Sequence, residues 1–331
     1  MHLHHIPTVL RLLLWVGLLS VSATVTAREF LLPPPGEAVV GELQHVATRQ
    51  EETLLEVARR YHVGFRELRI ANPNVDPWLP GERTQVILPT RYVLPDAPRQ
   101  GIVVNIPEMR LYYYPKPRKG EPARVITYPI SVGRRNWHTP LGLTRIVRKI
   151  RNPSWRPPKS IREEHAARGD PLPPVVPPGP DNPLGRYALR LGLPGYLIHG
   201  TNKPDGIGMQ VTHGCIRLFP EDIEDLFRRV PVNLPVRLVD QPFKGGWRNG
   251  ELYLEAHPPL DKKDGPLDLT EAVRVVSRAL QGHPDVEVDW SLVRRLAANP
   301  SGIPVVVSRT GDELIEANRS RGPAARDPGL F

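Results

Sequence analysis

The chain has almost no cysteine. Cys215 is the only one among 331 residues, and an internal disulfide needs two, so the folded units must be held together by apolar cores. The Cys215 thiol is therefore unpaired within the chain. It is either a small buried apolar residue, which is common for a free cysteine, or a reactive group, and the neighbouring residues must decide between the two.

No apolar run is long enough to cross a membrane. The most apolar stretch follows Arg11 and has about ten residues, half of the roughly 20 that a membrane-spanning helix needs. Val25 and Ala27 then suit cleavage by a signal peptidase after Ala27. We predict that residues 1–27 are a secretory signal and not an anchor, and that the protein acts in the periplasm.

Signatures of nucleic-acid binding are also absent. The formal net charge of +9 could attract a polyanion, but the sequence has no zinc-finger spacing, no aromatic RNA-binding motif and no concentrated block of Lys and Arg. We therefore exclude nucleic acid and expect a carboxylate-rich polymer as the anionic partner of an exported protein. The 40 prolines favour ordered loops and edge strands over a helical protein.

The first folded pattern in the chain is strand, helix, helix, strand. Thr53 and Glu56 form the Thr-x-x-Glu box that starts a helix, and Pro73 prevents a second helix from continuing. We predict a small βααβ module within residues 28–96. Its elements are expected at residues 43–47, from residue 54, at 65–71 and at 86–88.

Short strands dominate the next part of the chain. Val, Ile and Tyr supply the β-branched and aromatic surface that a sheet favours. Pro220 then opens a helix, since proline suits a first helical turn, and Ile223 and Leu226 fall on one face that packs against the sheet. We predict a mainly β domain over residues 97–241. Its strands are expected at residues 102–106, 109–114, 125–132, 143–150, 187–191, 196–199, 211–218 and 236–239.

One segment inside this β domain has no periodic pattern. Residues 152–185 are rich in proline and show neither helical nor strand periodicity. A loop of this length is usually disordered or functional. Because it ends just before the strands that carry His199 and His213, we expect a lid or a wall of a substrate cleft.

A small α+β extension is predicted for residues 242–331. Asn249-Gly250 is a typical hairpin turn, and the residues after Gly322 are expected to be disordered. The remaining elements are expected to be helices near 269–280 and 290–298 and a strand near 303–307. No internal repeat is evident, so the chain is predicted to hold three different units.

Two histidines could activate the thiol. A free cysteine has a pKa near 8.5, so only about 3% is thiolate at pH 7, and a nucleophile needs a base or a positive environment. His213 lies two residues before Cys215, and His199 sixteen before it. On an extended strand His213 and Cys215 point to the same side, while His199 can reach from an adjacent strand. The spacing permits a Cys/His pair with either histidine.

Gly214 and Arg217 also fit chemistry at Cys215. Without a side chain, Gly214 lets the backbone turn tightly and bring its amides near a carbonyl, as an oxyanion hole requires. Arg217 adds a fixed positive charge, which can bind a substrate carboxylate or help to keep the thiol ionised. The local sequence therefore favours a reactive Cys215 over a structural one.

These residues resemble the L,D-transpeptidases of the YkuD type. That family carries a histidine, a spacer of a dozen or more residues and then Ser/Thr-His-Gly-Cys. Here the sequence reads His199, a spacer and Thr212-His213-Gly214-Cys215. The two-part motif, within a β-rich domain that has a single cysteine, is far more specific than an isolated His-Gly-Cys.

The resemblance covers most of the chain. The segment ANPNVDPWLPG, residues 71–81, makes the N-terminal module similar to LysM, which binds glycans that contain N-acetylglucosamine. The branch that is most similar also pairs LysM with the catalytic domain and a C-terminal extension, and it attaches an outer-membrane lipoprotein to peptidoglycan. The implied fold is a YkuD-like β-sandwich with a short helix, between a LysM module and a small α+β extension.

The resemblance implies a mechanism that needs no cofactor. Cys215 attacks the diaminopimelate carbonyl in a peptidoglycan tetrapeptide stem, releases D-alanine and forms a thioester. His199 removes the thiol proton and later deprotonates the acceptor amine, and the backbone carbonyl of Gly200 orients the His199 ring. The acceptor is left open: a second diaminopimelate in a 3-3 cross-link, a lysine of an outer-membrane lipoprotein, or water in an L,D-carboxypeptidase or hydrolase.

The neighbouring positions receive supporting roles from the same resemblance. The amides of Gly214 and Cys215 stabilise the oxyanion, and His213 is an orienting residue. Thr212 and Arg217 are assigned to binding of the donor stem. We therefore expect the positions around the thiol to act as one site.

Two other classes of function are kept as alternatives. His199, His213 and Cys215 with a water could hold a catalytic zinc, although no Glu or Asp of the usual metalloenzyme patterns lies near them. A non-catalytic protein would bind peptidoglycan through LysM without releasing D-alanine.

Overall fold

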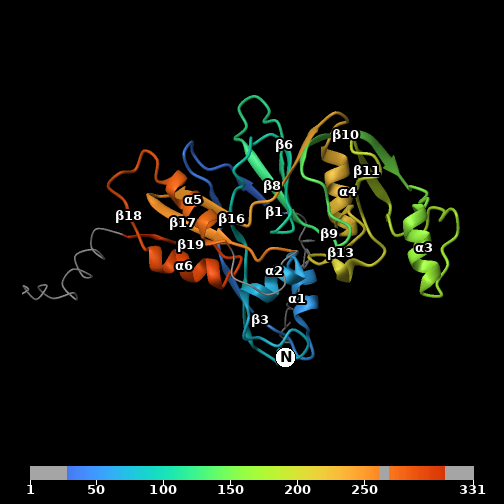
Figure 1. Ribbon diagram of the computed structural model, residues 1–331, viewed down its shortest axis with the longest axis horizontal. Helices are drawn as coiled ribbons and strands as arrows, with labels where there is room; N and C mark the ends of the chain where they lie inside the picture. Colours follow the sequence, from blue (N-terminus) through green and yellow to red (C-terminus); the bar gives the residue numbers. More distant parts are fainter. Residues whose placement is uncertain (1–27, 261–267, 310–331) are drawn as a thin grey trace, which may run out of the picture.

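The computed structural model describes residues 28–260 and 268–309 (Figure 1). The predicted signal, residues 1–27, and the predicted tail after Gly322 lie outside the described residues. Among the described helices, none is both long and apolar enough to span a membrane. The fold that positions Cys215 is therefore built from the described strands and short helices.

The strand, helix, helix, strand module is present near the N-terminus. Thr53 caps its first helix as predicted: the Thr53 hydroxyl accepts from the Glu56 N–H, and the Glu56 carboxylate accepts from the Thr53 N–H. Asn72 joins the second helix to the last strand through the backbone of Leu68 and Ile87. The elements are β3 (Gln44–Ala47), α1 (Leu54–Arg60), α2 (Phe65–Ala71) and β4 (Gln85–Leu88), and the two strands are antiparallel.

A nine-stranded sheet forms the body of the molecule, in the order β1-β8-β7-β6-β15-β10-β11-β12-β14 (Figure 1). Its strands are β1 (Arg28–Leu31), β6 (Gly101–Asn105), β7 (Arg110–Tyr114), β8 (Arg124–Pro129), β10 (Gly142–Arg151), β11 (Tyr187–Leu191), β12 (Leu197–His199), β14 (Ile216–Arg217) and β15 (Pro235–Val239). A separate pair consists of β9 (Val132–Gly133) and β13 (Gln210–Thr212).

The predicted β-sandwich is one continuous bent sheet. The first half of β10 pairs with β15 and the second half with β11, with a bulge between Ile146 and Arg148. A bulge bends its strand and increases the local twist. The long strand β10 therefore pairs with both halves of the sheet. It connects the two layers of the expected sandwich.

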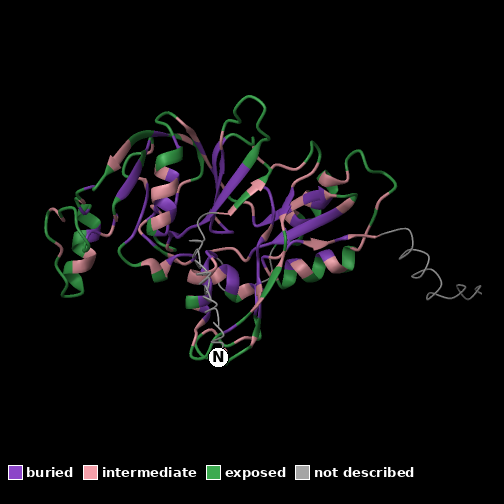
Figure 2. Ribbon diagram, turned by 180° about the vertical axis from the view of Figure 1, so that it is seen from behind, coloured by how far each residue is buried: buried purple, intermediate pink, exposed green. Residues whose placement is uncertain are grey.

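Helix α4 (Pro220–Arg229) packs its apolar side against this sheet. Pro220 lies in its first turn, as predicted, and Ile223 and Leu226 are buried in the same core as the strands. Figure 2 shows the buried residues concentrated along the central strands, with exposed residues on the loops around them. Burial of these side chains is what holds the sheet in its bent form.

The predicted strand over residues 211–218 is broken in the middle. β13 pairs with β9 outside the large sheet, whereas β14 is an edge strand of the large sheet. Between them, Gly214 has a φ of 99°, a conformation that glycine adopts without a steric penalty. The expectation that His213 and Cys215 point to the same side assumed an unbroken strand, and the structure does not have one there.

The start of the N-terminal module also differs from the prediction. Residues 28–96 do not form one unit, because β1 pairs with β8 as an edge strand of the large sheet. β2 (Val39–Gly41) and β5 (Arg91–Val93) pair with each other, and Val39 and Val93 pack on Tyr253 of the C-terminal extension. The compact module with a core of its own spans residues 44–88.

The segment predicted to be a structureless loop contains a helix, α3 (Lys159–Ala167). Ile161 is its only buried residue, so the sequence carries no apolar period that would predict a helix. Figure 1 shows α3 at the edge of the molecule, apart from the other helices. A short 3-10 helix, η1 (Pro204–Gly206), was also not predicted.

The C-terminal extension has the predicted α+β character. Asn249 and Gly250 have φ values of 51° and 81°, as a two-residue hairpin turn of this sequence requires. The elements are β16 (Phe243–Arg248), β17 (Glu251–Ala256), α5 (Leu269–Ala279), β18 (Glu287–Val288), α6 (Trp290–Ala298), β19 (Val305–Val306) and β20 (Ser308–Arg309). Its sheet is β16-β17-β19, with both helices packed in a common core.

Candidate active site

Two neighbouring parallel strands bring the predicted residues to one face of the sheet. In β12 and β14, Ile198 pairs with Ile216 and His199 with Arg217. Ile198 and Ile216 are buried in the core, and successive side chains on a strand alternate, so His199 and Arg217 lie on the opposite face. Cys215 immediately precedes β14, and its sulfur accepts from the backbone N–H of Leu197 at the start of β12, which places it beside these two strands.

The Cys215 side chain is half-buried. Its sulfur donates to the carbonyl of Gly195 at 3.7 Å. Burial raises the pKa of the Cys215 thiol above its ordinary value, and the backbone N–H of Leu197 and the charge of Arg217 partly oppose that rise. At neutral pH the resting group is therefore the protonated thiol.

The His199 ring is held in one orientation. Its Nδ1 donates to the backbone carbonyl of Gly200 at 2.7 Å, which is the contact that the sequence predicted. Burial and, to a smaller extent, the charge of Arg217 lower the pKa of His199 to about 3, against the opposing effect of the carbonyls of Gly200 and Leu184. Because Nδ1 carries the proton in this arrangement, Nε2 is left with a lone pair that can accept one.

A tight turn before Cys215 uses the Thr212 hydroxyl on both sides. The hydroxyl accepts from the Gly214 N–H at 3.2 Å and donates to the Cys215 carbonyl at 2.6 Å. Thr212 is only 1% exposed, and its hydroxyl braces the turn. A Cβ at Gly214 would meet the Tyr196 ring at 2.9 Å.

The hydrogen bond from the Gly214 N–H to the Thr212 hydroxyl changes the predicted oxyanion hole. The N–H of Gly214 already has an acceptor in Thr212, and its carbonyl accepts from the Thr139 hydroxyl at 2.9 Å. An amide that is committed to the turn is not available to a substrate oxygen. Of the two predicted donors, the Cys215 amide is the one compatible with this turn.

His213 interacts with residues that the sequence did not indicate. Its Nε2 lies 3.1 Å from Glu164 Oε2 on α3 and 2.9 Å from an Arg134 nitrogen, and Glu164 also contacts Arg134. The Trp137 ring packs edge-on against the imidazole at a centroid distance of 5.0 Å. Burial lowers the pKa of His213, and Glu164 opposes this. The His213 imidazole therefore links the turn before Cys215 to helix α3.

Arg217 is a candidate carboxylate-binding group. Burial lowers its pKa, and Cys215 opposes this. Its Nε is buried with no hydrogen-bond partner among the described residues, and a buried donor without an acceptor is costly. A substrate carboxylate placed beside Arg217 would supply the missing acceptor.

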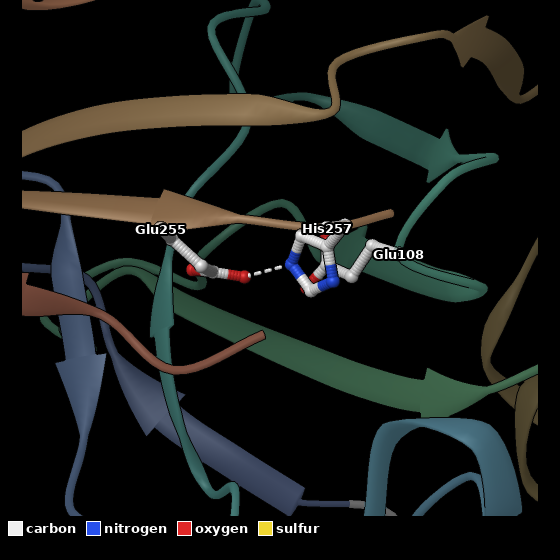
Figure 3. Close-up of side chains that lie close together, drawn as sticks. All are labelled: Glu108, Glu255 and His257. Carbon is white, nitrogen blue, oxygen red and sulfur yellow. Dashed lines mark hydrogen bonds and ion pairs between the residues drawn. The ribbon is translucent and has the colours of Figure 1, made fainter. Parts of the chain in front are cut away.

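The metal alternative fails on geometry. Among the described residues, one group of three His, Cys, Asp or Glu side chains has its ligand atoms within 4.8 Å of one another, and it consists of Glu108, Glu255 and His257 (Figure 3). His199, His213 and Cys215 do not form such a group.

The group in Figure 3 already contains a cation. The Lys244 ammonium lies 2.8 Å from Glu108 and 2.9 Å from Glu255, and all four residues are buried. A divalent metal would have to displace this ammonium from both carboxylates. The cluster is therefore an internal ion network and not a metal centre.

Comparisons with known proteins show the family of the chain. A family model described as the L,D-transpeptidase catalytic domain, YkuD, matches residues 99–238. The Escherichia coli (strain K12) proteins named Probable L,D-transpeptidase YbiS and YcfS are each 40% identical to this chain, over 88% and 89% of it and over 94% and 95% of their own lengths. The chain belongs to the L,D-transpeptidase family. It is accordingly an acyltransferase.

Two solved structures show some likeness to the chain. L,D-transpeptidase 3 from Mycobacterium tuberculosis has a TM-score of 0.31 and 20% identity, and the match covers 63% of this chain and 97% of that one. The catalytic domain of the Enterococcus faecium L,D-transpeptidase has a TM-score of 0.32 and 21% identity, over 44% of this chain and 100% of that one.

Proposed function

We propose that the protein is a periplasmic peptidoglycan L,D-transpeptidase that forms its acyl-enzyme on Cys215. The observation that supports the proposal is the pairing of β12 with β14, in which His199 lies opposite Arg217, two residues after Cys215. Arg217 acts electrostatically on both Cys215 and His199, so its guanidinium lies near both side chains.

In the acylation step, Cys215 Sγ attacks the diaminopimelate carbonyl of a tetrapeptide stem. His199 Nε2 takes the thiol proton and passes it to the leaving amine, so D-alanine departs and a thioester remains. General-base assistance is worth typically 10² to 10⁴ in rate. The Gly200 carbonyl keeps His199 in the tautomer that this step requires.

Charge on the substrate oxygen is stabilised by the Cys215 amide in this scheme. One such donor contributes about 10² to 10³ in rate. Arg217 binds a carboxylate of the donor stem, which satisfies its buried Nε. In the second step an amine that has given its proton to His199 attacks the thioester, forms the new amide and releases the thiol.

The N-terminal module is proposed to bind the glycan as a LysM module. Residues 44–88 have the βααβ arrangement, and Trp78, in the segment similar to LysM, is 58% exposed. Its ring lies 5.9 Å from that of Phe65, centroid to centroid, so one aromatic face is held at the surface. A peptidoglycan pull-down that Trp78→Ala leaves unchanged would count against this role.

The acceptor is proposed to be an amine, on a lipoprotein lysine or on a second diaminopimelate. The test is to incubate purified peptidoglycan with the enzyme, with and without a peptide that ends in lysine, and to digest and weigh the products. A muropeptide joined to the lysine peptide or to a second stem names the acceptor, and a shortened stem alone indicates a hydrolase. Wild-type protein that releases no more D-alanine than Cys215→Ala would contradict the proposed function.

A further inference from the structure

The face of the sheet that holds Cys215 also carries arginines. On β11, Leu189 and Leu191 are buried in the core, and Arg190 between them is exposed on the opposite face. Arg190 pairs with Arg148 on β10 and with Leu197 on β12. Three neighbouring strands thus place these side chains in one row across the sheet.

Cys215 lies at the end of this row. Since Ile198 pairs with Ile216, the preceding residues, Leu197 and Cys215, are also neighbours. The backbone N–H of Leu197 bonds to the Cys215 sulfur, which agrees with this placement. Strands are about 4.8 Å apart, so Arg190 and Arg148 start about 10 Å and 14 Å from Cys215.

The guanidinium groups in this row have no counter-charge. Arg148 and Arg190 lie directly opposite each other, an arrangement of like charges that costs stability. Within residues 28–260 and 268–309, neither side chain has a hydrogen bond or an ion pair, and both are exposed. The basic residue on the other face of β10 differs: the Lys149 ammonium donates to the Val230 carbonyl at 2.8 Å.

We propose that Arg148 and Arg190 bind carboxylates of the acidic peptide stem whose acyl group is transferred to Cys215. This inference rests on the proposed function and extends its substrate site beyond Arg217. An extended peptide advances about 3.3 to 3.6 Å per residue, so the row matches three to four residues of a stem that lies across the strands. Arginine binds carboxylates in a bidentate fork.

A lipid surface is a poorer fit to the same charges. A flat anionic membrane would need no alignment between the arginines and the reacting sulfur. The row is in register with Cys215 and ends there, as expected for a groove that guides one extended chain. Anionic vesicles are therefore the competing ligand in the test.

The test compares Arg148→Gln, Arg190→Gln and the double variant with wild-type protein. With a soluble tetrapeptide stem, each single variant is expected to raise KM roughly fivefold, the upper range for an exposed ion pair, with little change in kcat. The effect should shrink at high salt. It should also disappear with a stem whose side carboxylates are amidated, because the arginines then have no charge to bind.

The matched control is Arg118→Gln. The Arg118 side chain is 86% exposed and its nearest acid, Glu121, is 3.8 Å away, so this variant removes the same charge far from the row. It should bind the stem as wild type does. Since the exchanged side chains are exposed and Arg148 and Arg190 repel each other, the variants are expected to be at least as stable as wild type.

Binding is measured separately from turnover by calorimetry in a Cys215→Ala background. Weaker stem binding in the arginine variants supports the inference. If the wild-type protein binds the stem but releases no D-alanine, only the proposed function is overturned. Unchanged KM and Kd in the double variant would overturn the inference. The inference would also be overturned if the double variant lost its binding to anionic vesicles and still bound the stem as the wild-type protein does.

Discussion

A neutral thiol and a neutral imidazole share the resting site. Burial raises the pKa of Cys215 and lowers that of His199 to about 3, so the resting enzyme does not hold a thiolate–imidazolium pair. The proton must move when a carbonyl arrives and new charge can be stabilised. The Gly200 carbonyl fixes the His199 tautomer in advance. Only the transfer of the thiol proton to His199 then remains to be made.

The pH profile of acylation should reflect this environment. An ordinary histidine of pKa 6.5 is only about 3% unprotonated at pH 5, whereas His199, at about 3, remains a base there. We predict that kcat/KM for D-alanine release has no midpoint near 6.5 and changes little from pH 7 to 5. A fall to a few per cent over that range, in protein shown to be folded by circular dichroism, would contradict it.

The same shift has a consequence for stability. Unfolded His199 binds a proton below about pH 6.5, and folded His199 does not until about pH 3. The unfolded state therefore binds more protons in that interval, and stability falls as the pH is lowered through it.

Thr212→Val should damage the turn at the nucleophile. It leaves the Gly214 N–H and the Cys215 carbonyl without their partner, at a cost of about 1 to 3 kcal/mol. We expect a lower thermal midpoint and a lower kcat. Thr212→Ser keeps the hydroxyl and should retain most of both. Equal behaviour of the two variants would show that the hydroxyl does not brace the turn.

At the residue scale, the sequence predicted what is local and missed what is distant. The contact of His199 with Gly200 joins adjacent residues, so the motif predicts it. Glu164 lies 49 residues from His213, and nothing in the local sequence of either residue pairs them. The bracing role of Thr212 was not predicted, because an unbroken strand was expected where the structure has the turn that its hydroxyl stabilises.

At the scale of elements, α3 is the clearest difference between prediction and structure. Helices α1, α2, α4, α5 and α6 were all predicted, and each buries an apolar face. α3 buries only Ile161, and its attachment is ionic, through Glu164 to Arg134 and His213. A helix held by charges from other segments leaves no apolar pattern in its own sequence.

Glu164→Gln should loosen α3 without unfolding the sheet. The hydrogen bond from Arg134 lowers the pKa of Glu164 to about 2, so the carboxylate is charged at neutral pH and its interactions depend on that charge. We expect faster proteolysis within residues 152–185 and a several-fold lower kcat/KM. Glu163→Gln is the control, since Glu163 pairs only with Lys159 at 3.5 Å. Equal proteolysis of both variants would mean that Glu164 does not hold the helix.

On the scale of the whole molecule, buried ions join the three units. Arg110 of the large sheet, fully buried, bonds to Glu67 of α2 at 2.5 Å. Lys244 of the C-terminal extension bonds to Glu108 beside that sheet. The sequence could not predict these pairs, because charged residues are expected at the surface and each pair joins different units. These pairs connect the N-terminal module and the C-terminal extension to the large sheet.

Lys244→Met should test that network. It leaves Glu108 and Glu255 buried without their cation, which costs about 3 to 5 kcal/mol. The thermal midpoint is expected to fall by on the order of 10 °C. Lys159→Met, at a side chain that is 83% exposed, should change it little. A Lys244→Met protein as stable as wild type would show that the buried ammonium is dispensable.

The central claim is that His199 activates Cys215 for acyl transfer, and intact-protein mass spectrometry tests it most directly. After brief mixing with a tetrapeptide donor and no acceptor amine, wild-type protein should gain the mass of the stem without its D-alanine, mapped to Cys215. His199→Ala should acquire it at least a hundredfold more slowly. The account is contradicted if the adduct maps to another residue, if Cys215→Ala acquires it, or if His199→Ala forms it at the wild-type rate.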